Sequence, residues 1–424
     1  MQQLDKLVII SIIALSAMCY CGCIPALKTT KKWEAGKLKL SSKEIMESPS
    51  PFHGAFYCAS EGLEMNGPRG KSYDNGKTWQ PFTPGPDPMK GLPKDYRRGP
   101  YEDFVDPSNG WFLQLIWSLD VETNPKIDEP VEYLANTYLR YRVSTDKGKT
   151  YPLDKPVIMQ GDFDEKHPFP KVYRGKNAYL LGDAGSRPIR TKKGYILVPA
   201  IAFLLGPEGK MISPGGGFTY GDAMIIIGKW RKDQDIEWFY VYHIEADPTK
   251  ATRGMDEPTL MEMPDGRILC IMRGSNGGEK DPECKIPSYK WQSISEDGGF
   301  TWSKPEPWKY DTGENFFSPS AMSYLFKHSN GRFYWIGNIS DKNCQGNAPR
   351  YPLYIGEVNP ATFALVKSSL VMLDTIGPDD TEGLNLSHIR VFEDRETHNI
   401  VIPMSRHNLA YTKNKPVVYK ISAE

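Results

Sequence analysis

The sequence predicts an all-β protein, folded as a six-bladed β-propeller behind an N-terminal targeting segment. Three observations predict this fold: a hairpin-like unit that recurs six times, an eight-residue turn that recurs three times, and a composition rich in aromatic and turn-forming residues. The 424 residues include 12% aromatic residues, 38 Gly and 35 Pro. Such a composition favours many short strands over long helices.

Residues 1–23 form the first element, which we interpret as an export signal. Lys6 precedes the apolar run LVIISIIALSAM, which is too short to span a bilayer comfortably. The sequence CYCGC follows; Cys23 after Gly22 best fits a lipid-attachment site, whereas Tyr20 fits that pattern poorly. We expect a lipoprotein signal with a lipid anchor at Cys23, with ordinary secretion and an uncleaved anchor as the alternatives. The protein is therefore expected to be exported, as an outer-membrane lipoprotein or as a periplasmic or extracellular protein.

A linker over 24–44 and a propeller over 45–424 follow in this interpretation. The clearest propeller unit, 256–275, alternates apolar and polar residues, turns at Asp265-Gly266 and alternates again, which is a strong hairpin signal. Most units begin roughly 60–90 residues apart, which suits four-stranded blades with the hairpin as the inner two strands. The other units are 99–117, 186–203, 318–338, 386–408 and a truncated first copy at 50–62.

An octapeptide of the pattern Ser-x-Asp-x-Gly-x-Thr-aromatic occurs at 72–79, 144–151 and 295–302. It follows the hairpin after another strand, so we predict that it joins the outer two strands of a blade. Asp and Gly suit a tight turn in which the carboxylate accepts local backbone N–H groups, and the aromatic ring closes over the core of the blade. The side chains with this predicted structural role are Asp74, Asp146 and Asp297. A calcium loop is the alternative, although one Asp per copy supplies too few carboxylates.

Composition and missing motifs exclude several classes of function. Lys and Arg number 52, as do Asp and Glu, so the chain lacks the positive charge of a nucleic-acid-binding protein. The sequence contains no HExxH, GxSxG or CxxC motif, so metalloprotease, esterase and zinc sites are not indicated, and no metal or cofactor is predicted. Outside the signal the cysteines are Cys58, Cys270, Cys284 and Cys344. We expect four buried free thiols, with a Cys284–Cys344 disulfide as the alternative.

The three octapeptides on a chain of six β units resemble the Asp-box, or BNR, repeats of the sialidase superfamily, over roughly residues 45–420. The resemblance implies a pocket at the propeller axis, where the innermost strands begin. In that family three Args clamp a carboxylate, because a bidentate guanidinium–carboxylate pair is strong and directional. A Tyr–Glu pair serves as nucleophile and base, and an Asp is the general acid.

Part of this set is present in the sequence. The stretch DEPTLMEMPDGRILCIMR resembles the fourth-blade motif, which implies Glu257 as the base and Arg273 as the second Arg. RYPLYI resembles the strand with the third Arg, which implies Arg350. The first-blade Arg-Ile-Pro motif is replaced by SPSPFHGAF, and the position of the nucleophilic Tyr holds Asn385 or Leu386. Without a phenol there, the tyrosyl-glycoside intermediate of sialidases cannot form.

Further candidates come from the starts of other inner strands. Arg187 precedes Pro in the same frame as Glu257 and is predicted to replace the missing Arg, with Asp183 nearby. His53 and His388 are predicted near the axis as proton-transfer groups, because His titrates near neutral pH. A further candidate is Tyr220, in a Gly-rich loop, as an aromatic ring that stacks on a sugar. For each of these residues a structural role is the competing interpretation.

The sequence therefore predicts an exported, sialidase-like glycoside hydrolase that acts on an acidic glycan or oligosaccharide bearing a carboxylate. A polysaccharide lyase acting on uronic-acid glycans is one alternative. A non-catalytic glycan-binding propeller is the other, since losing the Tyr while keeping the Args would suit a binding protein.

Overall fold

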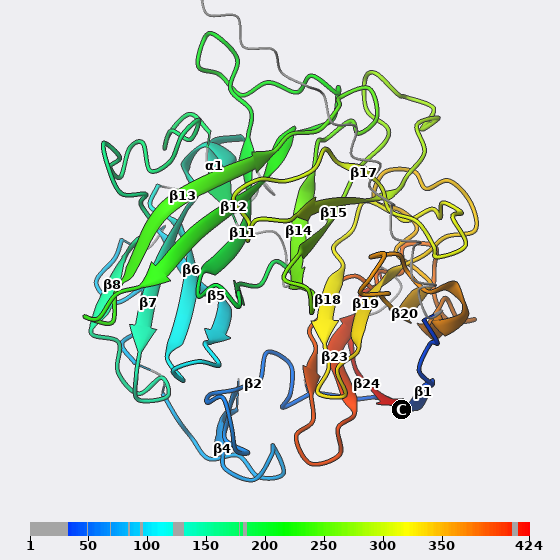
Figure 1. Cartoon of the computed structure of the whole chain (residues 1–424), viewed down its shortest axis with the longest axis horizontal. Helices are drawn as coiled ribbons and strands as arrows, with labels where there is room; N and C mark the ends of the chain where they lie inside the picture. Colours follow the sequence, from blue (N-terminus) through cyan, green and yellow to red (C-terminus); the bar gives the residue numbers. More distant parts are fainter. Residues whose placement is uncertain are drawn as a thin grey trace, which may run out of the picture. The chain divides into compact units, whose positions relative to one another are not determined.

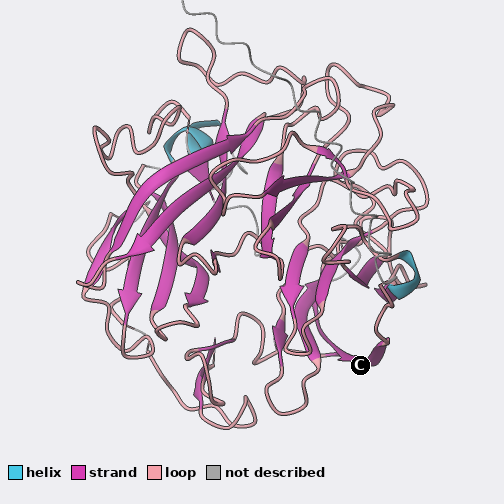
Figure 2. Cartoon of the chain, viewed as in Figure 1, coloured by secondary structure: helices cyan, strands magenta, loops and turns pink. Residues whose placement is uncertain are grey.

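The computed structural model of this chain describes residues 33–48, 50–67, 69–83, 85–93, 96–121, 131–177, 179–180, 185–408 and 414–424. The chain divides into Met1–Glu34 and Ala35–Glu424, and the second unit holds the strands of the described residues. Figure 2 shows it as strands and loops, with helical turns at α1 (Val131–Asn136) and η1 (Lys367–Ser369). No helix in this described part is both long and apolar enough to cross a membrane. The predictions for the export signal and for Cys23 concern residues outside it.

The strands form six sheets around a central axis (Figure 1), which confirms the predicted six-bladed β-propeller. We number the blades in chain order. Blades one to three contain β2 (Phe56–Tyr57), β3 (Met65–Gly67) and β4 (Gly70–Ser72); β5 (Arg97–Val105), β6 (Phe112–Leu119), β7 (Tyr138–Ser144) and β8 (Leu153–Pro156); and β9 (Tyr179–Leu180), β10 (Ile189–Arg190), β11 (Ile196–Phe203), β12 (Gly221–Trp230) and β13 (Ile236–Ile244).

Blades four to six complete the ring. They contain β14 (Asp256–Glu262), β15 (Ile268–Arg273), β16 (Lys290–Ser295) and β17 (Glu306–Pro307); β18 (Tyr324–Lys327), β19 (Phe333–Asn338), β20 (Leu353–Glu357) and β21 (Val371–Asp374); and β22 (Phe392–Glu393), β23 (Ile400–Arg406), β24 (Lys415–Ala423) and β1 (Leu38–Ile45).

The two ends of the described chain meet in blade six. Strand β1 pairs with β24 in antiparallel register, from Leu38 opposite Ala423 to Ile45 opposite Val417. This corrects the linker predicted over 24–44, because its last residues form the outer strand of a blade. The strand escaped prediction because only alternate side chains near its start are partly buried, and the rest of it faces solvent. Edge strands of this kind carry little apolar signal.

Five predicted hairpins are confirmed as inner strand pairs, including β14–β15 and β18–β19. The predicted unit 50–62 contains β2 alone, and its partner β3 lies beyond the predicted bounds. Both β14–β15 and β18–β19 turn on a Gly in the left-handed region, Gly266 (φ +88°) and Gly331 (φ +83°), a conformation that Gly adopts without steric penalty. Every residue of β11 is buried, as expected for a strand covered on both faces. Neighbouring blades share the core: the rings of Tyr141 in blade two and Trp238 in blade three lie 5.3 Å apart.

The octapeptide turns follow the third strand of blades one, two and four, and share the hydrogen bonds made by their Ser, Asp, Gly and Thr residues. In the 295–302 copy, the amide of Gly299 donates to Ser295 Oγ at 2.8 Å. The amide and hydroxyl of Thr301 donate to the Asp297 carboxylate at 3.0 and 2.6 Å. The Trp302 indole donates to the Gly299 carbonyl at 2.9 Å and its ring is buried. The predicted turn role of the carboxylate is thereby confirmed.

The four described cysteines are free. Cys58, Cys270 and Cys344 are buried, whereas Cys284 is partly exposed, so the expected burial holds for three of the thiols. The alternative disulfide between Cys284 and Cys344 is not formed.

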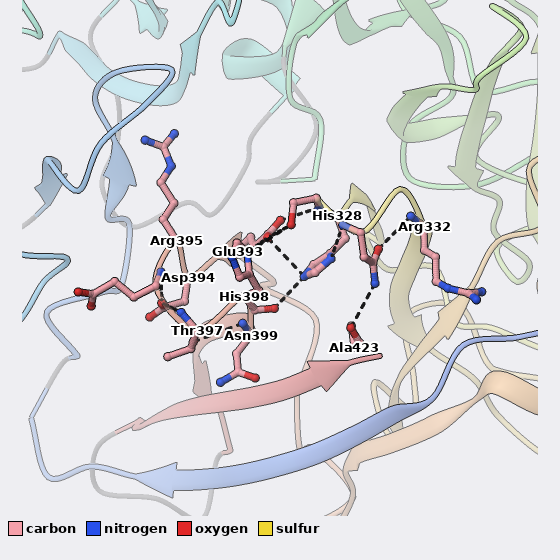
Figure 3. A network of polar contacts seen from close by, with 12 residues as sticks. His328, Arg332, Glu393, Asp394, Arg395, Thr397, His398, Asn399 and Ala423 are labelled. Carbon is pink, nitrogen blue, oxygen red and sulfur yellow. Dashed lines mark hydrogen bonds and ion pairs between the residues drawn. The ribbon is translucent and has the colours of Figure 1, made fainter.

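The hairpin turns and octapeptide turns lie at the opposite end of the blades from the residues that begin each inner strand. At that turn end a polar network joins blades five and six (Figure 3). Glu393 accepts a hydrogen bond from the Ser329 amide at 2.8 Å, and His398 Nδ1 lies 2.8 Å from its carboxylate. His328 Nε2 lies 2.8 Å from the His398 carbonyl oxygen. Adjacent blades are thus tied by side chains as well as by apolar packing.

Candidate functional site

The start of β14 and the end of β15 place two carboxylates around one guanidinium. Arg273 donates from Nη1 to Glu257 at 2.9 Å, and from Nε and Nη2 to Asp256 at 3.1 and 2.7 Å. The ladder is irregular between Asp256 and Thr259, and Glu257 has a left-handed φ of +44°, which is uncommon for a residue with a Cβ. This irregularity turns two successive carboxylates toward the same Arg. Glu257 and Arg273 are therefore together, although Arg273 binds carboxylates of the chain itself.

Lys290, which opens the neighbouring strand β16, adds a buried amine to this group. Its residue is 1% exposed, and Nζ donates to the carbonyls of Ala321 and, at 3.4 Å, Pro319. Burial lowers the pKa of Lys290 to about 7; the Arg273 charge adds to the shift and the Glu257 charge opposes it. The sequence did not point to Lys290, because a Lys at a strand start normally indicates exposure to solvent.

Arg350 lies where blades five and six meet. It donates to the carbonyls of Asn347 (3.2 Å) and Ser320 (3.4 Å) and to the hydroxyl of Ser387 (3.3 Å). Its backbone also pairs with that of Asn385, at the entry to the inner strand of blade six. Arg350 lies within electrostatic reach of Lys290, as do Glu257 and Arg273. These residues, far apart in the sequence, therefore share one end of the blades.

Three histidines lie near this entry to blade six. The rings of His388 and His407 lie 5.2 Å apart, and His53 lies within electrostatic reach of His407. The pKa of His407 is lowered by burial and then by His388, and that of His53 by burial and then by Arg390. His407 was not predicted. It follows directly after β23, the second inner strand of blade six, in the same way that Arg273 lies at the end of β15, the second inner strand of blade four.

Arg187 lies deeper on the axis, between blades. Its guanidinium donates to the Tyr324 hydroxyl of blade five at 2.6 Å and to the Asp103 carbonyl of blade two at 2.9 Å. Burial raises the pKa of the Asp103 carboxyl, against the opposing effects of Gln114 and nearby guanidinium groups. A cavity of about 570 Å³, lined in part by Arg187, Asp103 and Tyr324, extends from here toward the hairpin turns. Tyr324 and Asp103 were not predicted.

One predicted residue, Tyr220, does not reach the site as expected. Tyr220 is 3% exposed and its hydroxyl donates to the Ala246 carbonyl at 3.1 Å, so the ring is not available to stack on a sugar. The loop turns this side chain inward just before β12 enters the core, which corrects the prediction. Asp183 lies outside the described residues. Within the described ranges, no group of three or more His, Cys, Asp or Glu side chains is arranged to hold a metal ion.

Comparisons with known proteins find similarity in structure alone. No protein-family model matches the chain, and no curated protein sequence does. A protein of unknown function from Dyadobacter fermentans is similar with a TM-score of 0.52 and 14% identity, over 91% of this chain and 99% of that one. A mutant of the NanB sialidase from Streptococcus pneumoniae is similar with a TM-score of 0.50 and 12% identity, over 91% of this chain and 68% of that one.

An α-L-arabinofuranosidase from Fusarium graminearum also matches, with a TM-score of 0.46 and 13% identity, over 92% of each chain. At identities this low, the stronger two likenesses show the fold alone. The class defined by the fold is therefore the six-bladed, sialidase-like β-propeller, and the chemistry of the chain must be argued from its own residues.

Proposed function

We propose that this protein is a sialidase-like glycoside hydrolase that binds an acidic glycan at the axial end holding Glu257 and Arg350. The observation that supports the proposal is that Glu257 and Arg350, from the entries of different blades, are both neighbours of the buried Lys290, with His388 following a residue that Arg350 contacts. Arg350 is hydrogen-bonded to Ser387, the neighbour of His388, and shares Lys290 as an electrostatic neighbour with Glu257. A guanidinium beside a carboxylate and an imidazole offers the groups that binding and proton transfer to an acidic sugar require.

In this proposal Arg350 binds the carboxylate of the sugar. Arg273 holds the Glu257 carboxylate through a hydrogen bond of 2.9 Å, and this carboxylate acts as base toward water or stabilises positive charge that develops on the sugar ring. His388, or its neighbours His53 and His407, gives a proton to the leaving oxygen. The entry to blade six offers Asn385 and Leu386 in place of a phenol. We therefore expect direct attack by water, without a tyrosyl intermediate.

A screen of acidic glycans read by mass spectrometry tests this proposal. We expect two products whose summed mass exceeds that of the substrate by one water molecule. We also expect weak or absent turnover of a fluorogenic sialoside, because that reaction normally depends on the missing Tyr. An unsaturated product that absorbs in the ultraviolet would establish a uronic-acid lyase. Brisk sialoside turnover would mean that another residue, such as Tyr351, supplies the phenol.

A non-catalytic glycan-binding protein is the second candidate. It is favoured by the contact between Arg273 and Glu257, since this ion pair engages the carboxylate proposed as base. Calorimetric binding of sialic or glucuronic acid, with every glycan recovered intact, would support this candidate. Failure to bind any acidic sugar would contradict both candidates, because both depend on Arg350.

We also propose that the protein is exported and carries a lipid on Cys23. The proposal is supported by the apolar run and the CYCGC sequence that follows it. Metabolic labelling with radioactive palmitate tests this, with a Cys23→Ala variant as the matched control. Equal labelling of the two proteins would contradict a lipid at Cys23, and a protein found only in the cytoplasm would contradict export.

A further inference from the structure

Lys290 carries a buried amine that contacts one short segment of the neighbouring blade. Its Nζ donates to the carbonyls of Pro319 and Ala321, the residues on either side of Ser320. A buried amine is stable only where its donors find acceptors, so these contacts are strongly favoured over an unpaired Nζ. The strand β16 thereby fixes the backbone of the segment that leads into β18.

Ser320 itself faces the proposed ligand-binding Arg. Its carbonyl accepts a hydrogen bond from Arg350 Nη2 at 3.4 Å. Ser320 as a whole is 1% exposed, and its hydroxyl has no hydrogen-bond partner among the described residues. Lys290 therefore binds the carbonyls of Pro319 and Ala321, and the carbonyl of Ser320 between them binds Arg350.

We propose that Lys290 is a positioning residue for Arg350, acting through the segment Pro319–Ala321, and that it adds a titratable positive charge beside the acid-binding site. The inference rests on the proposed function, in which Arg350 binds the acidic group of the sugar. It assigns to a residue of blade four, which does not touch the ligand, an influence on ligand affinity in blade five.

The charges around Lys290 determine the direction of its effect. Glu257 faces it from β14, Arg273 from β15, and Cys344 and Arg350 from the loop before β20. Because burial brings the pKa of Lys290 to about 7, the amine gains a proton as the pH falls through neutrality. The added charge attracts a carboxylate that remains ionised over this range. We therefore expect acidic sugars to bind more tightly at pH 6 than at pH 8.5.

The test is calorimetric titration of the full-length protein with N-acetylneuraminic acid and with glucuronic acid at both pH values. Lys290→Met removes the donors and the charge, and we expect a loss of affinity on the order of tenfold together with a flatter pH profile. Lys290→Gln keeps two amide N–H donors, and should restore much of the affinity at pH 8.5 without restoring the pH dependence. His53 and His407 are present in all of these proteins, so their contribution to the pH profile cancels in the comparison.

Lys71→Met is the matched control. Lys71 is also 1% exposed, but it lies on β4 of blade one, where it pairs with Glu64. Its loss should reduce stability while leaving the affinity and its pH profile as in the wild type. An effect on binding as large as that of Lys290→Met would show that any buried Lys matters equally, and would overturn the inference.

The remaining outcomes separate the inference from the proposed function. If the wild type binds acidic sugar and Lys290→Met binds it equally with the same pH profile, the inference is wrong and the function stands. If the wild type binds neither acid, the proposed function is wrong. In that case crystal structures decide the positional claim: an unchanged contact between Arg350 and the Ser320 carbonyl in Lys290→Met would overturn it.

Discussion

At the scale of single residues, Arg273 is the centre of charge compensation in the site. Its side chain is 10% exposed and those of Asp256 and Glu257 are each 14% exposed, so all three charges are largely removed from water. Such a group is stable as a unit, because each charge offsets the desolvation of another. Removing one partner leaves the others buried and uncompensated. Arg273 thus fixes the side chains of both carboxylates through three hydrogen bonds.

We predict that Arg273→Met lowers the free energy of unfolding by about 3–5 kcal/mol, because two buried carboxylates lose their counter-charge. Urea unfolding followed by circular dichroism measures this. The control is Arg267→Met in the hairpin turn of the same blade, where Arg267 pairs with Asp265 at a side-chain exposure of 31%. A more exposed pair contributes about 1 kcal/mol or less. Equal losses in the two variants would contradict the central role of Arg273.

The resemblance to a family motif implied some of these positions and not others. It implied Glu257 and Arg273, and the predicted hairpin is the reason that the start of one strand lies beside the end of the next. The inward turn of Tyr220 and the burial of Lys290 could not, because both depend on contacts between segments that periodicity does not describe. Lys290 is buried only because the carbonyls of Pro319 and Ala321, from another blade, lie within reach.

At the scale of elements, the octapeptide is a self-contained turn. The Ser hydroxyl and the Asp carboxylate satisfy the backbone of the turn from within, and the carboxylate is stabilised as an anion. The pKa of Asp74 is lowered to about 2, first by hydrogen bonds from Thr78, and the pKa of Asp297 is lowered because hydrogen bonds from Thr301 outweigh its burial. The sequence predicted these turns well because their interactions are local.

We predict that Asp297→Ala lowers the stability by about 1–3 kcal/mol at neutral pH, as expected for a lost turn network. Because the folded-state pKa of Asp297 is depressed, its contribution is present above the unfolded pKa and is lost as the pH falls through the folded value. The difference from the wild type should therefore shrink in acid. Binding of acidic sugar per folded molecule should not change; its loss with an unaltered melting temperature would contradict a structural turn.

The network of Figure 3 predicts a second acid-sensitive contact, between blades. Burial alone would raise the pKa of Glu393, but hydrogen bonds from Ser329 and His398 lower it. The resulting stabilisation is present above the unfolded pKa of Glu393 and is lost as the pH falls through its folded value. We expect Glu393→Gln to lower the free energy of unfolding by about 1–2 kcal/mol at pH 7, and by less below about pH 4.

Thermal and urea unfolding across this pH range measure the effect of Glu393→Gln. Glu396→Gln is the control, since Glu396 carries the same side chain three residues on but pairs with Lys77 on the exposed surface. It should unfold nearly as the wild type does. A Glu393→Gln deficit that persists unchanged in acid would mean that the lost carboxylate charge is not its cause.

At the scale of the whole molecule, the propeller is a ring closed by the pairing of β1 with β24. The hairpin repeats predicted the number of blades, because each blade repeats a strong local pattern. They did not predict the closure, because the pairing joins residues almost four hundred positions apart and β1 has only a weak apolar pattern. Leu38 and Leu40 nevertheless pack against the buried cluster shared by blades five and six. The strand therefore stabilises the last blade and the ring together.

We predict that a chain beginning at residue 46 unfolds at a clearly lower urea concentration than one beginning at residue 33. The truncated ring leaves β24 as an open edge and uncovers the apolar residues beneath β1.

Leu40→Ala is the milder change and should lower the free energy of unfolding by roughly 1–2 kcal/mol, since Leu40 is only partly buried. Lys39→Ala, on the exposed face of the same strand, should have almost no effect. Because β24 pairs with β23, which leads directly to His407, the truncated chain should also bind acidic sugar more weakly. Equal unfolding midpoints for the two chain lengths would show that the ring is held closed without β1, by the packing between blades alone.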